Sequence, residues 1–120
     1  MEYRGRIMNA WKPLVLGAAA LALAGCATTD PQVDPWFSRD KAYHFAAGAI
    51  AGAGVALAAR HSDVGDGAAA TLGVGAAATI GAGKEWYDRD IRKTYWSWKD
   101  FAWDLFGGLV GSFIAASAAD

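Results

Sequence analysis

Apolar residues gather in three long segments, and none of these segments alternates apolar and polar positions with a period of two. The segments cover residues 40–60, 66–88 and 98–119, and short polar breaks separate them. Alanine, the residue with the highest helix propensity, is abundant in each segment, so the pattern favours helices over strands. The sequence therefore predicts an all-α fold, an up-down-up three-helix bundle formed by residues 39–120.

The polar breaks carry residues that commonly begin helices. Ser62 or Asp63 is placed to cap the second helix, and Ser97 directly precedes the third. Asp100 follows Ser97 by three residues, which approximates a capping box, a pair of side chains that satisfy each other's backbone N–H groups. We therefore expect the third helix to begin at residue 98.

Small residues recur every four positions in all three segments, a spacing that lets helix backbones approach closely. The expected contact stripes are Gly48, Gly52 and Ala56 in the first helix, Gly67, Thr71, Gly75, Thr79 and Gly83 in the second, and Gly107, Gly111 and Ala115 in the third. Each glycine costs an aqueous helix about 1 kcal/mol relative to alanine, so packing or an apolar solvent must offset the loss.

The abundance of glycine in apolar helices suggests a membrane environment, because a backbone in lipid must satisfy its own hydrogen bonds. The sequence therefore predicts a Gly/Ala-rich bundle that is partly embedded in a membrane. The alternatives are a soluble bundle of small helices and a glycine-zipper oligomer that associates through the stripes.

The charged residues of the three helices are predicted to meet at one end of the bundle. An up-down-up arrangement brings together the start of the first helix, the end of the second and the start of the third. The candidate cluster is Asp40, Lys41, His44, Lys84, Glu85, Asp88, Lys99, Asp100 and Asp104. Spacings of three and four residues place Asp40 with His44 and Asp100 with Asp104 on common helix faces.

Two interpretations of this cluster differ in function. Three lysines lie beside the acidic groups, which favours a structural network of ion pairs with no catalytic residue, no metal and no cofactor. The alternative is a membrane-interface enzyme, or a site for a lipid head group or metal, built on His44, Glu85 and Asp100, because histidine with carboxylates suits divalent cations and acid–base chemistry. The first interpretation is preferred, and it predicts a protein that is not an enzyme.

Aromatic residues flank the same charged positions, as they do where membrane proteins meet water. They are Trp36, Phe37, Tyr43, Phe45, Trp86, Tyr87, Tyr95, Trp96, Trp98, Phe101 and Trp103. The net charge of −1 argues against a nucleic-acid partner, which requires a clustered basic face. The expected partner is the membrane itself, with an envelope protein or a second copy of the chain as further candidates.

The N-terminal region resembles the signal peptide of a bacterial lipoprotein. Three basic residues precede an uncharged segment, residues 13–25, that is too short to span a bilayer. The sequence Leu23-Ala24-Gly25-Cys26 matches the lipobox and holds the only cysteine, so we expect a signal peptide over 1–25 and a lipidated Cys26.

Three details of this region bear on its processing. Cys26 could instead be a buried free thiol, Ala22-Leu23-Ala24 could serve an ordinary signal peptidase, and translation could start at Met8 rather than at Met1. Residues 26–38 carry the polar and proline residues of an extended tether. By the sorting rule for such lipoproteins, Ala27 after the cysteine favours the outer membrane, with the lipid anchor on its periplasmic face.

The blocks DKAYHF, GAGKEWYDRD and WSWKDFAWDLFGG, which contain the cluster residues, carry a family resemblance. They resemble the three signature blocks of the YfiM-type lipoproteins, small envelope proteins of Gram-negative bacteria, over about residues 36–111. A looser similarity connects the DK-x-x-H opening to VanZ-like membrane proteins. The resemblance implies a lipidated helical protein of the cell envelope, and it implies no reaction.

Overall fold

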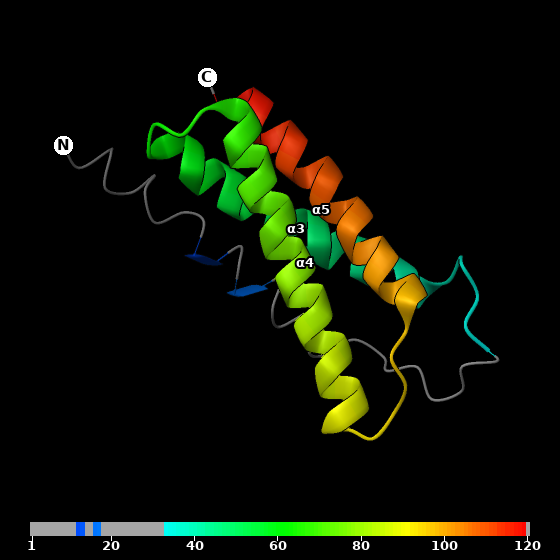
Figure 1. Ribbon diagram of the computed structural model, residues 1–120. Helices are drawn as coiled ribbons and strands as arrows, with labels where there is room; N and C mark the ends of the chain where they lie inside the picture. The colour runs from blue at the N-terminus through cyan, green and yellow to red at the C-terminus, as the bar shows by residue number, and fades with distance from the viewer. Residues whose placement is uncertain (1–11, 14–15, 18–32, 120) are drawn as a thin grey trace.

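The structure is a computed structural model, and it describes residues 12–13, 16–17 and 33–119. The predicted signal peptide and Cys26 therefore lie almost entirely outside the described residues. Three long helices make up the fold: α3 covers Arg39–His61, α4 covers Asp66–Asp90 and α5 covers Trp98–Ala118. Every pair of these helices is in contact, and each runs antiparallel to the next one in the chain (Figure 1).

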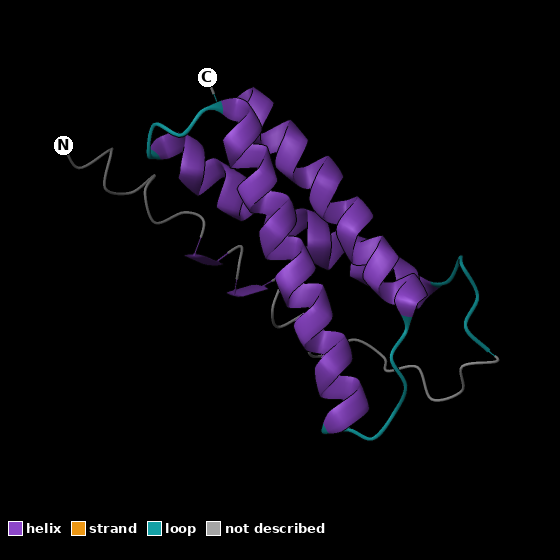
Figure 2. Cartoon of the chain, viewed as in Figure 1, coloured by secondary structure: helices purple, strands orange, loops and turns teal. Residues whose placement is uncertain are grey.

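The described part of the chain is all-α, which confirms the predicted three-helix bundle (Figure 2). The predicted helix boundaries agree with the observed ones to within two residues. Two N-terminal caps are serine side chains. Ser38 Oγ accepts the backbone N–H of Lys41 at 3.4 Å, and Ser97 Oγ accepts that of Asp100 at 3.1 Å.

The expected cap of α4 at Ser62 or Asp63 is wrong, because both residues end α3 instead. The backbone N–H groups of Asp63 and Val64 bond back to the carbonyls of Arg60 and Ala59, at 3.1 and 3.0 Å. Asp63 adopts the left-handed conformation with φ of 64°. This pattern is the Schellman motif that terminates many helices. Helix α4 then starts after Gly65, which supplies no side-chain cap.

The interior of the bundle is made of small and charged side chains. Among the residues that the structure describes, the buried apolar ones are all alanines, namely Ala47, Ala51, Ala56, Ala59, Ala69, Ala77 and Ala116. The largest fully buried side chains are Glu85, Asp88, Asp100 and Ser112. Large apolar side chains point outward, for example Phe113 and Ile114 on α5, which are 66% and 60% exposed. The distribution is thus inverted relative to an ordinary soluble protein, in which large apolar side chains fill the core.

The predicted small-residue stripes of α3 and α5 form the contact between these two helices. A methyl group on Gly107 would lie 2.0 Å from the carbonyl oxygen of Phe45, and one on Gly111 would lie 2.2 Å from that of Ala49. A methyl group on Gly48 would meet the carbonyl oxygen of Asp104 at 2.1 Å. Because backbone blocks the missing methyl groups, these glycines are required for the close approach of α3 and α5.

The predicted stripe of α4 is wrong. Gly67, Gly75 and Gly83 have nothing within 4 Å of an added methyl group, and Thr71 and Thr79 are exposed. The stripe that faces the other helices lies two residues further along the chain and consists of Ala69, Gly73, Ala77 and Gly81. Both stripes have the same four-residue spacing, so spacing alone could not distinguish the contact face from the exposed one.

Candidate functional site

The charged residues meet at one end of the bundle, where α3 begins, α4 ends and α5 begins. The buried members of the predicted cluster are Lys41, His44, Lys84, Glu85, Asp88, Asp100 and Asp104. Asp40 and Lys99 are only partly buried and lie at its edge. Cys26, the predicted lipidation site, lies outside the described residues.

His44 lies at the centre of the acidic part of the cluster. Its Nδ1 lies 3.0 Å from Oδ1 of Asp104. Its Nε2 lies 3.4 Å from Oδ2 of Asp100 and 3.8 Å from Oδ1 of Asp40. Carboxylates from two helices therefore surround both ring nitrogens of one buried imidazole.

The buried lysines bind carboxylates on both sides of this centre. Lys41 Nζ binds Oδ1 of Asp100 and Oδ1 of Asp34, and it thus joins α3, α5 and the segment before α3. Lys84 binds Asp88 within α4. An unpaired charge in such a position is costly, so removal of one partner of either pair would destabilise the fold around it.

Glu85 connects α4 to the start of α5. Its Oε2 accepts the backbone N–H of Ser97 at 2.7 Å. The predicted capping box is therefore only half formed, because Glu85 rather than Asp100 occupies this N–H. Burial raises the pKa of Glu85 to about 7, against the opposing effects of the Ser97 hydrogen bond and of nearby Lys84. Glu85 is thus a buried carboxyl group that gains or loses a proton near neutral pH.

Sequence reasoning missed Asp34, which we assigned to the extended tether. Its Oδ2 accepts the hydroxyl of Ser97 at 2.7 Å, and its backbone carbonyl accepts Lys99 Nζ at 2.6 Å. Burial raises the pKa of Asp34, but the hydrogen bonds from Lys41 and Ser97 outweigh burial and hold the pKa below its ordinary value. The aromatic pair Trp36 and Phe37 in the same segment was the available signal, because flexible tethers are poor in aromatic residues.

The expected balance of one lysine beside each acidic group is not what the structure shows. Lys99 binds the backbone of Asp34 and lies over the ring of Trp36, with 5.4 Å between its Nζ and the ring centre. Lys41 and Lys84 remain as the buried lysines of the cluster, and Asp40 and Asp104 face His44. Negative charge is therefore concentrated around the imidazole.

Several buried polar atoms of this end make no hydrogen bond to the described residues. They are Asp40 Oδ1, His44 Nε2, Glu85 Oε1 and Asp104 Oδ2 in the cluster, and Trp96 Nε1 in the loop between α4 and α5. Such atoms are rare in folded proteins and are costly unless a ligand, an ion or water satisfies them. Two of these atoms, Asp40 Oδ1 and His44 Nε2, face each other at 3.8 Å, which is ion-pair distance when the imidazole is protonated.

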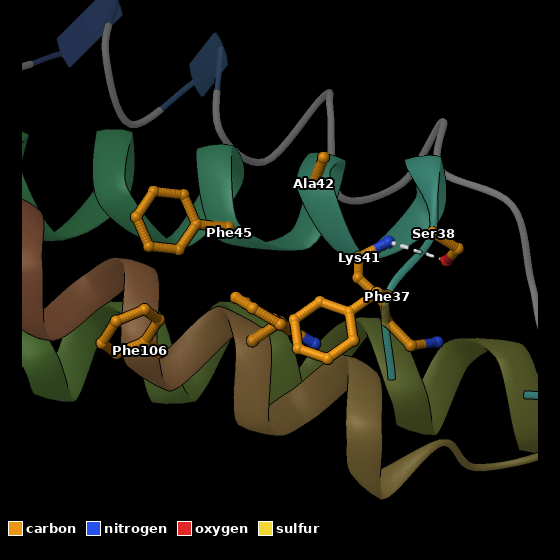
Figure 3. A pocket seen from close by; sticks show the side chains of 7 residues that line it. Phe37, Ser38, Lys41, Ala42, Phe45 and Phe106 are labelled. Carbon is orange, nitrogen blue, oxygen red and sulfur yellow. Dashed lines mark hydrogen bonds between the residues drawn. The ribbon is translucent and has the colours of Figure 1, made fainter. Parts of the chain in front are cut away.

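An apolar groove of about 420 Å³ opens beside the cluster, between α3 and α5. It is lined by Phe37, Ser38, Lys41, Ala42, Phe45, Trp103 and Phe106. Phe45 and Phe106 project from the two facing helices, and Phe37 lies at the other side of the groove, near Lys41 (Figure 3). The surface next to the charged end is thus aromatic.

Helices α3 and α5 are long and apolar enough to cross a membrane, by length and composition alone. Both also carry buried charged residues of the cluster within their first two turns. Membrane association is therefore compatible with these two helices.

No protein-family model matches the chain, and no curated protein or solved structure matches it significantly. The resemblance to the YfiM-type lipoproteins stays a prediction from the three sequence blocks.

Proposed function

We propose that this chain is a small lipid-anchored protein of the outer membrane of the cell envelope, with a structural or binding-accessory role at the membrane surface. The anchor is a lipidated Cys26, and the bundle dips into the leaflet that carries the anchor. One acyl chain gives only marginal binding, so apolar side chains of the bundle would reinforce attachment.

The inverted distribution of side chains is the observation that carries this proposal. Phe106, Leu109, Phe113 and Ile114 are all more than half exposed on α5, while alanine and glycine fill the interior. In water this arrangement leaves large apolar surfaces uncovered, whereas contiguous apolar patches on soluble monomers are usually small. In lipid the same surfaces are solvated, and small residues provide the close helix contacts.

The distribution of charge supports a bundle that dips into one leaflet over one that spans the bilayer. Basic residues gather around 84–99, at the end where the anchor enters, and the opposite turn has Arg60 and His61. An anchor on the periplasmic side would place the more basic end outside, against the usual bias of inner-membrane proteins. Exposed Trp36, Trp86 and Trp98 at the same end suit the lipid–water interface.

Two arms of one experiment test the anchor and the embedding separately. Cells expressing the wild type or Cys26→Ala are labelled with radioactive palmitate, and each protein is then mixed with vesicles of phosphatidylethanolamine and phosphatidylglycerol. We expect label on the wild type only, and flotation of both proteins with the vesicles. A wild type without label refutes the anchor, and a Cys26→Ala protein that stays in the aqueous fraction refutes the embedding.

A matched pair of substitutions on α5 locates the embedded surface. In the Cys26→Ala protein, Phe113→Glu places a charge on the exposed apolar face and should abolish flotation. Ser117→Glu places the same charge at an exposed polar position of the same helix, and most of this variant should still float with the vesicles. Equal flotation of the two variants would show that this face of α5 does not contact lipid.

A further inference from the structure

We propose that Asp40, His44 and Asp100 bind a divalent transition-metal ion, such as Zn²⁺ or Mn²⁺, with Asp104 as the residue that orients the histidine. The proposed ligand atoms are Oδ1 of Asp40, Nε2 of His44 and a carboxylate oxygen of Asp100. One potential ligand atom from each of these residues lies within 4.8 Å of the others.

The distances between the ligand atoms suit a common ion. Two atoms bound to one Zn²⁺ at the tetrahedral angle lie about 3.3–3.6 Å apart, given bonds of about 2.0–2.2 Å. His44 Nε2 lies 3.4 Å from Asp100 and 3.8 Å from Asp40. A small inward movement of Asp40, whose side chain is 22% exposed, would bring its Oδ1 to the distance from Nε2 that a shared ion requires.

The hydrogen-bond state of His44 is the independent observation that points to an ion. The residue is 3% exposed, and its Nε2 makes no hydrogen bond within the described part of the chain. Its Nδ1 faces Asp104 at 3.0 Å. In the neutral tautomer with the proton on Nδ1, the Asp104 carboxylate accepts the Nδ1–H, and the lone pair of Nε2 is available to an ion. Metal-binding histidines are commonly oriented in this way by a carboxylate behind the ring.

Charge gives a second reason for a cation at this point. Asp40 and Asp100 each bring a carboxylate to Nε2, and Oδ1 of Asp40 also makes no hydrogen bond among the described residues. Lys41 binds Oδ1 of Asp100 and lies 3.6 Å from Oδ2 of Asp40. A divalent ion would sit against the other oxygen of each carboxylate, where it would bind Oδ1 of Asp40 together with Nε2 of His44. Nitrogen and oxygen ligands together suit zinc or manganese, and three protein ligands leave a coordination position for water or an anion.

Titration of the metal into the detergent-purified full chain, stripped with EDTA, tests this site. Isothermal calorimetry with Zn²⁺ and with Mn²⁺ should show one ion per chain for at least one of them. His44→Gln should weaken that binding at least tenfold, and Asp104→Asn should weaken it about 10–100-fold, the usual effect of losing such an orienting group. Absence of binding to the wild type, or equal binding by His44→Gln, would overturn the proposal.

Two control variants exclude other sources of binding. His61→Gln removes the chain's other histidine, in the last turn of α3, and Cys26→Ser removes the only thiol. Both should bind the ion as the wild type does. If either loses binding while His44→Gln keeps it, the metal lies elsewhere and the proposal fails.

A measurement on the wild type alone covers the case in which His44→Gln does not fold. Co²⁺ bound by nitrogen and oxygen ligands at a four-coordinate site absorbs visible light, and the absorption should appear at one equivalent and disappear on addition of Zn²⁺. The melting temperature should rise with Zn²⁺ concentration, because an ion that binds only the folded state stabilises it. A wild type that shows neither effect has no site of this kind.

Discussion

The close contact between α3 and α5 leads to a sharp prediction for two glycines that both lie inside apolar helices but face different surroundings. Gly107 of α5 faces Phe45, and Gly75 of α4 has nothing within 4 Å of an added methyl group. Both residues lie inside helices, and neither has a positive φ. Replacement by alanine therefore raises helix propensity equally at the two positions, by about 1 kcal/mol.

At Gly107, packing should turn this gain in stability into a loss. The new methyl group would lie 2.0 Å from the carbonyl oxygen of Phe45, whereas ordinary contact begins at 3.4 Å. The obstacle is backbone, so the two helices must separate by well over an ångström. Overpacking costs about 1–3 kcal/mol, and a rigid obstacle favours the upper value, so we expect a net loss of about 2 kcal/mol after the gain in propensity.

Thermal unfolding in mild detergent, followed by circular dichroism, measures both effects. About 4–8 °C of melting temperature corresponds to 1 kcal/mol in a domain of this size. Gly107→Ala should therefore melt about 8–16 °C below the wild type, and Gly75→Ala should melt up to about 8 °C above it. A stable Gly107→Ala together with a destabilised Gly75→Ala would show that the outer stripe of α4 is a contact surface and that the packing described above is wrong.

Three further predictions concern the charged end. Burial raises the pKa of Glu85 from 4.5 to about 7, so the folded state holds this proton more tightly than the unfolded state does. The free energy of unfolding should therefore fall by about 3 kcal/mol as pH rises from 4.5 to 7. Urea unfolding measured across this pH range should show the fall in the wild type and not in Glu85→Gln. Asp34→Asn should cost about 1–3 kcal/mol by breaking the pair with Lys41, and limited proteolysis should then cut near residue 34. Ser97→Ala should cost at least about 1 kcal/mol, because it removes both the cap of α5 and the hydroxyl that donates to Asp34, whereas Ser62→Ala, at the end of α3, should change the melting temperature little.

Helical spacing and polarity were sufficient to predict the bundle and the gathering of charge at one end. The three apolar segments were separated by unambiguous polar breaks, and short connections force antiparallel neighbours. Positions at the start of α3 and α5 and at the end of α4 then had to meet, whatever the details of packing. The cluster of buried charges around His44 follows from this topology alone.

The contact face of α4 needed information that spacing does not contain. The series Ala69, Gly73, Ala77 and Gly81 continues at the same interval to Glu85, which is buried. The rival series ends at Gly83, whose neighbours on the same face are exposed. The helix face that carries the buried charges therefore identifies the contact stripe. The small-residue spacing and the position of Glu85, taken together, predict the correct face of α4.

Asp34 could not be assigned from local sequence because its partners lie far away in the chain. Its contacts with Ser97 and Lys99 join residues more than sixty positions apart. The local composition, with prolines on either side of the residue, is typical of an extended linker. Only the arrangement of the helices brings Lys41 within reach of it.

The two ends of the bundle differ in their buried side chains, and this difference makes it hard to tell whether a residue of the charged end serves stability or binding. At the end opposite the cluster, the core consists of Ala56, Ala59, Ala69 and Ala116, which bury only methyl groups. The charged end holds the largest buried side chains and joins all three helices, so a truncation there leaves an uncompensated buried charge and costs about 3–5 kcal/mol. Loss of stability in an alanine variant of His44 would therefore be expected whether or not the residue binds an ion. Substitutions that keep the shape of the side chain, together with direct measurement of the bound metal, are the ones that distinguish a structural network from a site.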